Sequence, residues 1–172
     1  MLSFSKVNNA GRSSGKPSGR IRNLNKPPKG EPWVWLPREL LESPAWRLRS
    51  INCVRLIDFL LVEHMSHAGT ENGNLLATHD QLTEWGCSRH QIKRAIDEAE
   101  YLGLVRVKRG GRWAGKNVPS RFKITFYSDA NLYAATNDWK SRTEEDIQEW
   151  KKRRKALQSN AKRKRTKTKA SP

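Results

Sequence analysis

The sequence predicts a small α+β domain between two basic tails, and three observations lead to this prediction. Helix start signals and apolar stretches recur through residues 31–130, a few short segments alternate like strands, and both ends are poor in apolar residues. The chain has 172 residues, with 34 Lys and Arg against 17 Asp and Glu, so its formal net charge is +17. This length suits about one domain with flanking segments. The charge makes a polyanion the expected partner.

The excess positive charge belongs to the two ends of the chain. Residues 1–30 hold seven basic residues and no acidic one, and residues 151–172 hold eleven and none. Segments 1–30 and 159–172 have little to bury, so we predict disordered basic tails there. A mitochondrial transit peptide is the alternative for the start, and the glycines that interrupt it disfavour this. Between the ends, only residues 88–123 are clearly basic.

Several functional classes lack support in the sequence. No apolar run is long enough to span a membrane, and the first residues contain no secretory signal. Cys53 and Cys87 are too few for a disulfide scaffold, and the cysteines and histidines lack metal-site spacing. His64 and His67 are interpreted as a frayed helix end. We expect no membrane partner, metal, cofactor or enzymatic activity, and a cytoplasmic, nucleoid-associated location.

Proline and serine mark the first helices of the domain. Residues 31–37 form an extended apolar entry because two prolines interrupt them. A short helix is predicted over 38–42, and Ser43, which a proline follows, caps another short turn. Ser50 caps a long helix over 51–67, whose apolar residues cover most of its circumference. That helix is the predicted centre of the domain.

Two helices joined by a tight turn are predicted after a short strand at 75–77. The pattern Ser/Thr-x-x-Gln begins at Thr78 and again at Ser88, and each occurrence predicts a capping box at a helix start. The first helix ends near Trp85, and the second runs to Leu102. The join between them is three residues long and begins with glycine, as in a helix–turn–helix.

Two alternating segments predict a hairpin. Residues 104–108 and 121–127 have the period of strands, and the polar, glycine-rich segment 109–120 connects them as a loop. In the second strand the large apolar residues are expected to face inward, and the outward set is Arg121, Lys123 and Thr125.

A third unit follows the hairpin. Residues 131–142 are predicted to be a linker, and residues 143–158 an amphipathic helix with acidic residues in its first turn. Its narrow apolar stripe contains Ile147, Trp150 and Leu157. Three alternatives remain for this helix: it docks on the domain, it pairs with its twin in a homodimer, or it lies on DNA.

The order helix, short strand, helix, helix, strand, loop, strand is that of a winged helix. Residues 33–127 resemble the winged helix–turn–helix modules of bacterial DNA-binding proteins. The stretch 41–52 is similar to the opening of phage and plasmid replication-organiser domains. The stretch 71–82 is similar to short winged-helix proteins carried on alphaproteobacterial mobile elements. The resemblance implies a winged helix–turn–helix domain at 31–130 whose partner is double-stranded DNA.

In such domains the N-terminal part of the second helix enters the major groove, and the hairpin contacts the backbone. The candidate DNA contacts on the helix are Ser88, Arg89, His90, Gln91, Lys93 and Arg94. Those on the hairpin are Arg106, Arg109, Arg112, Trp113, Lys116, Arg121 and Lys123. Asp97 and Glu98 indicate that the C-terminal half of the helix faces away from phosphate. The alternative for all these residues is an ordinary solvated surface.

These features predict sequence-specific binding of duplex DNA, with a role in transcriptional regulation in a bacterial mobile element. One alternative is a plasmid or phage replication initiation or organiser protein with the same fold. Another is an RNA-binding or ribosome-associated adaptor, because basic tails suit any polyanion. A third is a protein-interaction module with solubilising tails.

Overall fold

The computed structural model describes residues 29–113 and 115–169, so most of the predicted N-terminal tail and the last three residues lie outside the described part. At 112, 113, 116, 117 and 161–169 only the backbone is described. The chain divides into two units, Met1–Trp33 and Val34–Pro172. Every described helix and strand belongs to the second unit.

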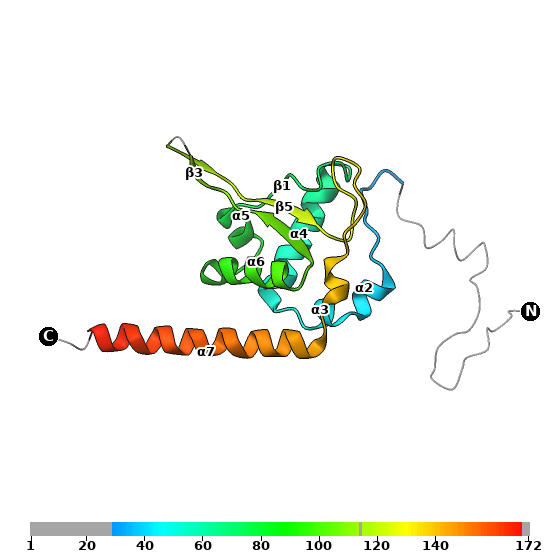
Figure 1. Ribbon diagram of the computed structural model, residues 1–172. Helices are drawn as coiled ribbons and strands as arrows, with labels where there is room; N and C mark the ends of the chain where they lie inside the picture. Colours follow the sequence, from blue (N-terminus) through cyan, green and yellow to red (C-terminus); the bar gives the residue numbers. More distant parts are fainter. Residues whose placement is uncertain (1–28, 114, 170–172) are drawn as a thin grey trace, which may run out of the picture. The chain divides into compact units, whose positions relative to one another are not determined.

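Helices form most of this second unit (Figure 1). The α-helices are α2 (Arg38–Glu42), α3 (Pro44–Arg47), α4 (Ile51–Ser66), α5 (His79–Glu84), α6 (Ile92–Tyr101) and α7 (Glu144–Lys169). Two short 3-10 helices are η1 (Arg89–Gln91) and η2 (Asp138–Ser141).

A small antiparallel sheet completes the architecture. It has the order β1-β5-β2 and consists of β1 (Leu75–Leu76), β2 (Val105–Lys108) and β5 (Arg121–Ile124). Between β2 and β5, a separate two-stranded ribbon pairs β3 (Gly111–Trp113) with β4 (Lys116–Val118). The predicted α+β class is therefore confirmed.

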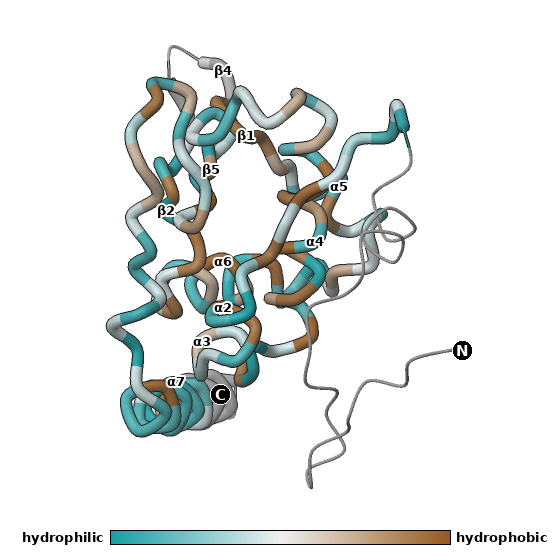
Figure 2. Tube along the Cα trace, turned by 90° about the vertical axis from the view of Figure 1, so that its right-hand side faces the viewer, coloured by the Kyte–Doolittle hydropathy of each residue, from teal (hydrophilic) through white to brown (hydrophobic). Residues whose placement is uncertain are grey.

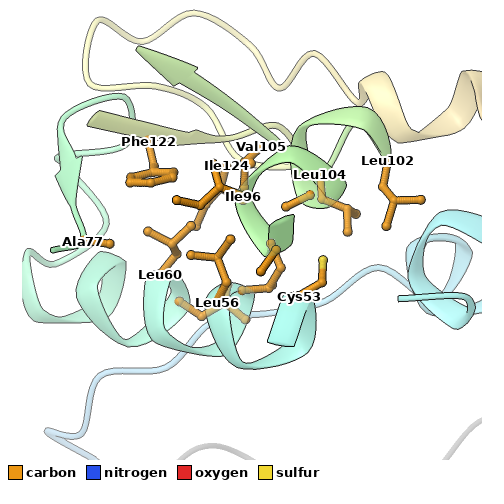
Figure 3. Packing of buried hydrophobic residues seen from close by; sticks show 14 of the residues in the cluster. Cys53, Leu56, Leu60, Ala77, Ile96, Leu102, Leu104, Val105, Phe122 and Ile124 are labelled. Atoms are coloured by element: carbon orange, nitrogen blue, oxygen red, sulfur yellow. The ribbon is translucent and has the colours of Figure 1, made fainter. Parts of the chain in front are cut away.

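The core lies between α4, α6 and one face of the sheet (Figure 3). Leu56 and Leu60 of α4 are fully buried, and so are Phe122 and Ile124 of β5. Burying one such side chain stabilises a fold by about 1.5–3 kcal/mol. The apolar α4 is thus the centre of the domain, as predicted. By contrast, α7 is hydrophilic along most of its length (Figure 2).

Local capping signals were accurate at three helix starts. The side chains of Ser43, Ser50 and Thr78 accept the expected backbone hydrogen bonds, and Thr78 forms a complete capping box with Gln81. The box predicted at Ser88 is wrong. Its side chain makes no cap bond, the next three residues form η1, and α6 begins only at Ile92.

The hairpin differs from its prediction in two respects. The segment 109–120 was predicted as a loop, but it contains the ribbon β3–β4. The second strand ends at Ile124, and Thr125, predicted to face outward, is fully buried. Its hydroxyl donates to the carbonyl oxygen of Gly103 at 2.7 Å, so the end of α6 holds this side chain inside.

The predicted linker 131–142 is part of the folded domain. It contains η2, whose Trp139 is only 3% exposed. Gly103 has φ +70°, and a Cβ there would lie 2.6 Å from the carbonyl carbon of Asp138. This close approach requires glycine at the end of α6. The following helix, α7, begins near the predicted position but continues to Lys169, past the predicted end at 158.

Asn72 joins the segment after α4 to the sheet. It is fully buried, and its Oδ1 accepts from the backbone N–H of Ile124 at 2.7 Å. Its Nδ2 donates to the carbonyl oxygens of Ile124 and Ser128, each at 2.9 Å. One side chain therefore satisfies buried backbone groups just beyond the end of β5.

We expect Asn72→Ala to lower the free energy of unfolding by about 2–3 kcal/mol, because it leaves buried backbone groups without partners. Urea denaturation of the full chain measures this loss. The matched control is Asn74→Ala, since Asn74 is exposed and its side chain bonds, among the described residues, to exposed side chains. Equal losses for the two variants would contradict the proposed role of Asn72.

Candidate nucleic-acid interface

The turn between α5 and α6 is anchored to α4. Gly86 ends α5 with φ +93°, as its predicted place after the helix requires. Its carbonyl oxygen accepts from the guanidinium of Arg55. Two residues later, the backbone N–H of Ser88 donates to Oδ1 of Asn52 at 3.0 Å. These bonds from α4 fix where η1 and α6 begin, and they explain why the Ser88 N–H is not free for a capping box.

One face of α6 is buried and the opposite face is exposed, as in an amphipathic helix. Its core face is buried, namely Ile92, Ala95, Ile96 and Ala99. The predicted contacts at its start lie together on the surface: Ser88, Arg89, His90, Lys93 and Arg94 are exposed, and Gln91 is half-buried. The structure therefore brings all six helix candidates onto one continuous stretch of η1 and α6.

Several of these side chains are held by neighbours. Arg89 forms an ion pair with Asp80 of α5 at 2.9 Å, and both side chains remain mostly exposed. Arg94 donates to Oε1 of Gln91 at 3.1 Å. Within the described part of the chain, Lys93 forms no ion pair. Exposed ion pairs are weak, so none of these contacts prevents binding of an anionic ligand.

Glu98 has a role that the sequence analysis missed. It was interpreted as an acidic residue facing away from phosphate, but it is only 7% exposed. Its Oε1 accepts from the backbone N–H of Ser50 at 2.9 Å, and its Oε2 accepts from the Ser50 hydroxyl. The carboxylate therefore sits at the N-terminus of α4, where the helix dipole favours a negative charge. Its position on the edge of the apolar stripe of α6 was the available signal.

Two of the hairpin candidates lie on the outer face of the sheet, and each forms an ion pair with an aspartate. Arg106 and Lys123 are register partners across β2 and β5. Arg106 forms two hydrogen bonds to the carboxylate of Asp138, at 2.7 and 3.0 Å. Lys123 pairs with Asp129 at 2.7 Å and is 19% exposed. Hydrogen bonds from these bases lower the pKa of both carboxyl groups.

The remaining candidates lie along the hairpin. Arg109, after β2, contacts Asp97 at 2.9 Å and Glu100 at 2.8 Å, so it fastens the hairpin to α6. Arg121 donates to the side chain of Asn74 at 2.8 Å and is exposed. The backbones of Arg112, Trp113 and Lys116 form the ribbon β3–β4, and their side chains lie outside the described atoms.

The C-terminal helix docks on the domain, which is one of the three predicted alternatives. Ile147 is fully buried, and Trp150 stacks on Tyr101 of α6 with ring centroids 4.5 Å apart. Arg154 forms an ion pair with Asp97 at 3.0 Å. Leu157 of the predicted stripe is 68% exposed. Most of the stripe that a homodimer would use therefore packs inside the same chain.

The described residues also bear on membrane and metal chemistry. Within 29–113 and 115–169, no helix has the length and apolar character that a membrane crossing needs. The same residues contain no group of three or more His, Cys, Asp or Glu able to hold a metal ion. His64 is not a frayed end as predicted, because it is 6% exposed and stacks on Tyr127. Burial lowers the pKa of His64.

Comparisons of the chain with protein-family models, with curated proteins and with solved structures found no match. The interpretation of this surface therefore depends on its own geometry and charge.

Asp138→Asn is expected to lower the free energy of unfolding at pH 7 by about 1 kcal/mol. The expected loss is small because solvent around the exposed Arg106 weakens its attraction to Asp138. Because Arg106 lowers the pKa of Asp138 in the folded state, the pair stabilises the fold above the usual pKa of an aspartate. That contribution is lost as the pH falls through the lowered pKa, so wild type and variant converge in acid.

Urea denaturation at a series of pH values tests this expectation. The control is Asp80→Asn, because Asp80 is 74% exposed in its pair with Arg89. We expect the control to cost little at any pH. A difference between Asp138→Asn and wild type that persists in acid would show that the ion pair is not its cause.

Proposed function

We propose that this chain is a winged helix–turn–helix protein that binds duplex DNA with sequence preference. The element order α4, β1, α5, α6, β2, β5 and the sheet order β1-β5-β2 support this assignment. In it, α5 and α6 form the helix–turn–helix. The hairpin β2–β5, with the ribbon β3–β4 at its tip, is the wing.

The observation that carries the proposal is the exposed basic start of the second helix. Arg89, His90, Lys93 and Arg94 project from η1 and the first turn of α6, directly after a turn that α4 holds in place. A helix presented in this way fits the major groove with its N-terminal residues toward the bases. A rigid support matters because base recognition needs well-placed donors.

The chemistry of these side chains suits base recognition. Arg94 carries a planar guanidinium that can donate two hydrogen bonds to guanine, and Gln91 offers an amide that can pair with adenine. The hydrogen bond between their side chains restricts both before any ligand binds. Lys93 suits a phosphate contact, because its ammonium group is a point charge without a fixed hydrogen-bonding plane.

The ion pairs divide the hairpin candidates into two groups. Arg106, Arg109 and Lys123 act mainly within the fold, because each is paired with an acidic residue. Arg121 and the ribbon β3–β4 remain as backbone contacts on the wing. The basic ends of the chain add affinity that weakens with salt and does not depend on sequence. The biological role that we propose is regulation of transcription by a mobile element.

Selection of bound duplexes from a random DNA pool, with the full chain at about 150 mM salt, tests the proposal. An enriched motif is the expected result. Competition with structured RNA belongs in the same experiment. A pool without a motif, together with stronger binding to RNA, would reject sequence-specific recognition of duplex DNA.

If Arg94 donates two hydrogen bonds to a base, Arg94→Ala should weaken binding to the selected site by about 1–3 kcal/mol and relax the preference at one position. The control is Arg38→Ala, which removes the same charge from an exposed pair on α2. The motif of each variant is compared with that of wild type. Equal weakening by both variants, without a change of motif, would exclude a base contact by Arg94.

A further inference from the structure

A cleft of about 340 Å³ lies between α6 and α7 beside the start of α4. Here it is named the α6–α7 cleft, and its main polar lining is Gln91, Arg94, Lys151, Arg154, Lys155 and Gln158. We infer that this cleft binds a backbone phosphate of the duplex DNA. The inference rests on the proposed function and adds a second backbone contact, separate from the wing.

The charge of the cleft favours an anion. Among the described residues, four basic ones line it, and Glu98 is the one acidic lining residue. Both carboxylate oxygens of Glu98 are occupied by Ser50, one by the backbone N–H and one by the hydroxyl. The negative charge therefore points at the start of α4 and is already compensated there.

Two of the four basic residues already bond to other parts of the protein, and the other two line the cleft from opposite helices. Lys151 donates to the carbonyl oxygen of Leu48, and Arg154 is paired with Asp97. Among the described atoms, Arg94 of α6 is bonded only to the neutral Gln91. Lys155 of α7 forms no ion pair with any described residue. Arg94 and Lys155 are thus the pair available to hold a phosphate, and Lys155 is the main phosphate ligand where Arg94 contacts a base as proposed above.

The cleft is built from fixed elements. Two contacts hold α7 against α6: Trp150 stacks on Tyr101, and Arg154 forms an ion pair with Asp97. The two residues of α7 are one helical turn apart. Lys155 follows Arg154 directly, so its position is set by a docked helix. A charge on a docked helix loses less backbone entropy on binding than one on a flexible tail.

The cleft lies on the flank of α6 opposite Glu100, one of the two acidic residues of α6 that Arg109 of the hairpin contacts. The other, Asp97, lies between the two flanks and is shared with Arg154 of the cleft lining. Arg109 of the hairpin contacts Glu100, whereas the cleft is lined by Gln91, Arg94 and Glu98, which follow one another at helical spacing. A helix in the major groove has a phosphate backbone on each side. The wing suits one of these backbones, and the α6–α7 cleft suits the other.

The test compares Lys155→Ala with Lys152→Ala in the full chain. Both changes remove one positive charge from an exposed residue of α7, but Lys152 does not line the cleft. On the selected duplex, we expect Lys155→Ala to weaken binding about tenfold and Lys152→Ala by less than about twofold. Lys155→Ala should also reduce the slope of log affinity against log salt by about 0.9, without changing the motif.

Phosphate-ethylation interference supplies an independent measurement. For wild type, ethylation of one phosphate on the strand not contacted by the wing should weaken binding. For Lys155→Ala, ethylation of the same phosphate should have no effect. Lys155→Arg, which keeps the charge, should restore both the affinity and the sensitive phosphate. Thermal melting of each variant verifies that the fold is retained.

The inference is overturned if Lys155→Ala and Lys152→Ala weaken binding equally, because α7 would then act as diffuse charge. It is also overturned if Lys155→Ala weakens binding to structured RNA but not to the duplex. Failure of the proposed function is a different result, since wild type itself would then select no duplex motif.

Discussion

The contact between Glu98 and Ser50 sets the relation between the central helix and the helix that we propose for DNA recognition. A buried carboxylate is costly unless its oxygens are well bonded. Here Ser50 supplies two donors at the start of α4, where the helix dipole also favours a negative charge. One side chain of α6 thereby completes the N-terminal cap of α4. Asn52 and Arg55 then hold the preceding turn from the same helix.

Local signals predicted the parts of the fold that local interactions determine. Ser43, Ser50 and Thr78 each bond to a backbone group three residues away, so a short pattern is enough to identify them. Ser88 shows the same pattern, but Asn52 takes its backbone N–H from a distance of 36 residues along the chain. A competing tertiary partner cannot be recognised from spacing within one helix.

The sequence predicted which residues belong to the candidate site, but it did not predict their ion-pair partners. The apolar period of α6 identifies its buried apolar residues, whereas the burial of Glu98 beside them depends on its bonds to Ser50 in another helix. The partner of Arg106 was missed, since Asp138 lies in a segment without helical or strand periodicity that resembled a linker. Trp139 packs that segment into the core. The docking of α7 was likewise undecided, because it depends on a ring stack between distant elements.

The acidic residues of α6 explain how a basic surface can be built around a helix that is itself partly acidic. Asp97 is contacted at once by Arg109 from the hairpin and by Arg154 from α7. The charge that would repel phosphate is thus used to attach the two flanking elements that suit the DNA backbone. Because both attachments lie in the C-terminal half of α6, Arg89, His90 and Lys93 at its start remain exposed. These ion pairs therefore separate the two roles that we propose for α6. Its C-terminal half holds the hairpin and α7, and its N-terminal end contacts the bases.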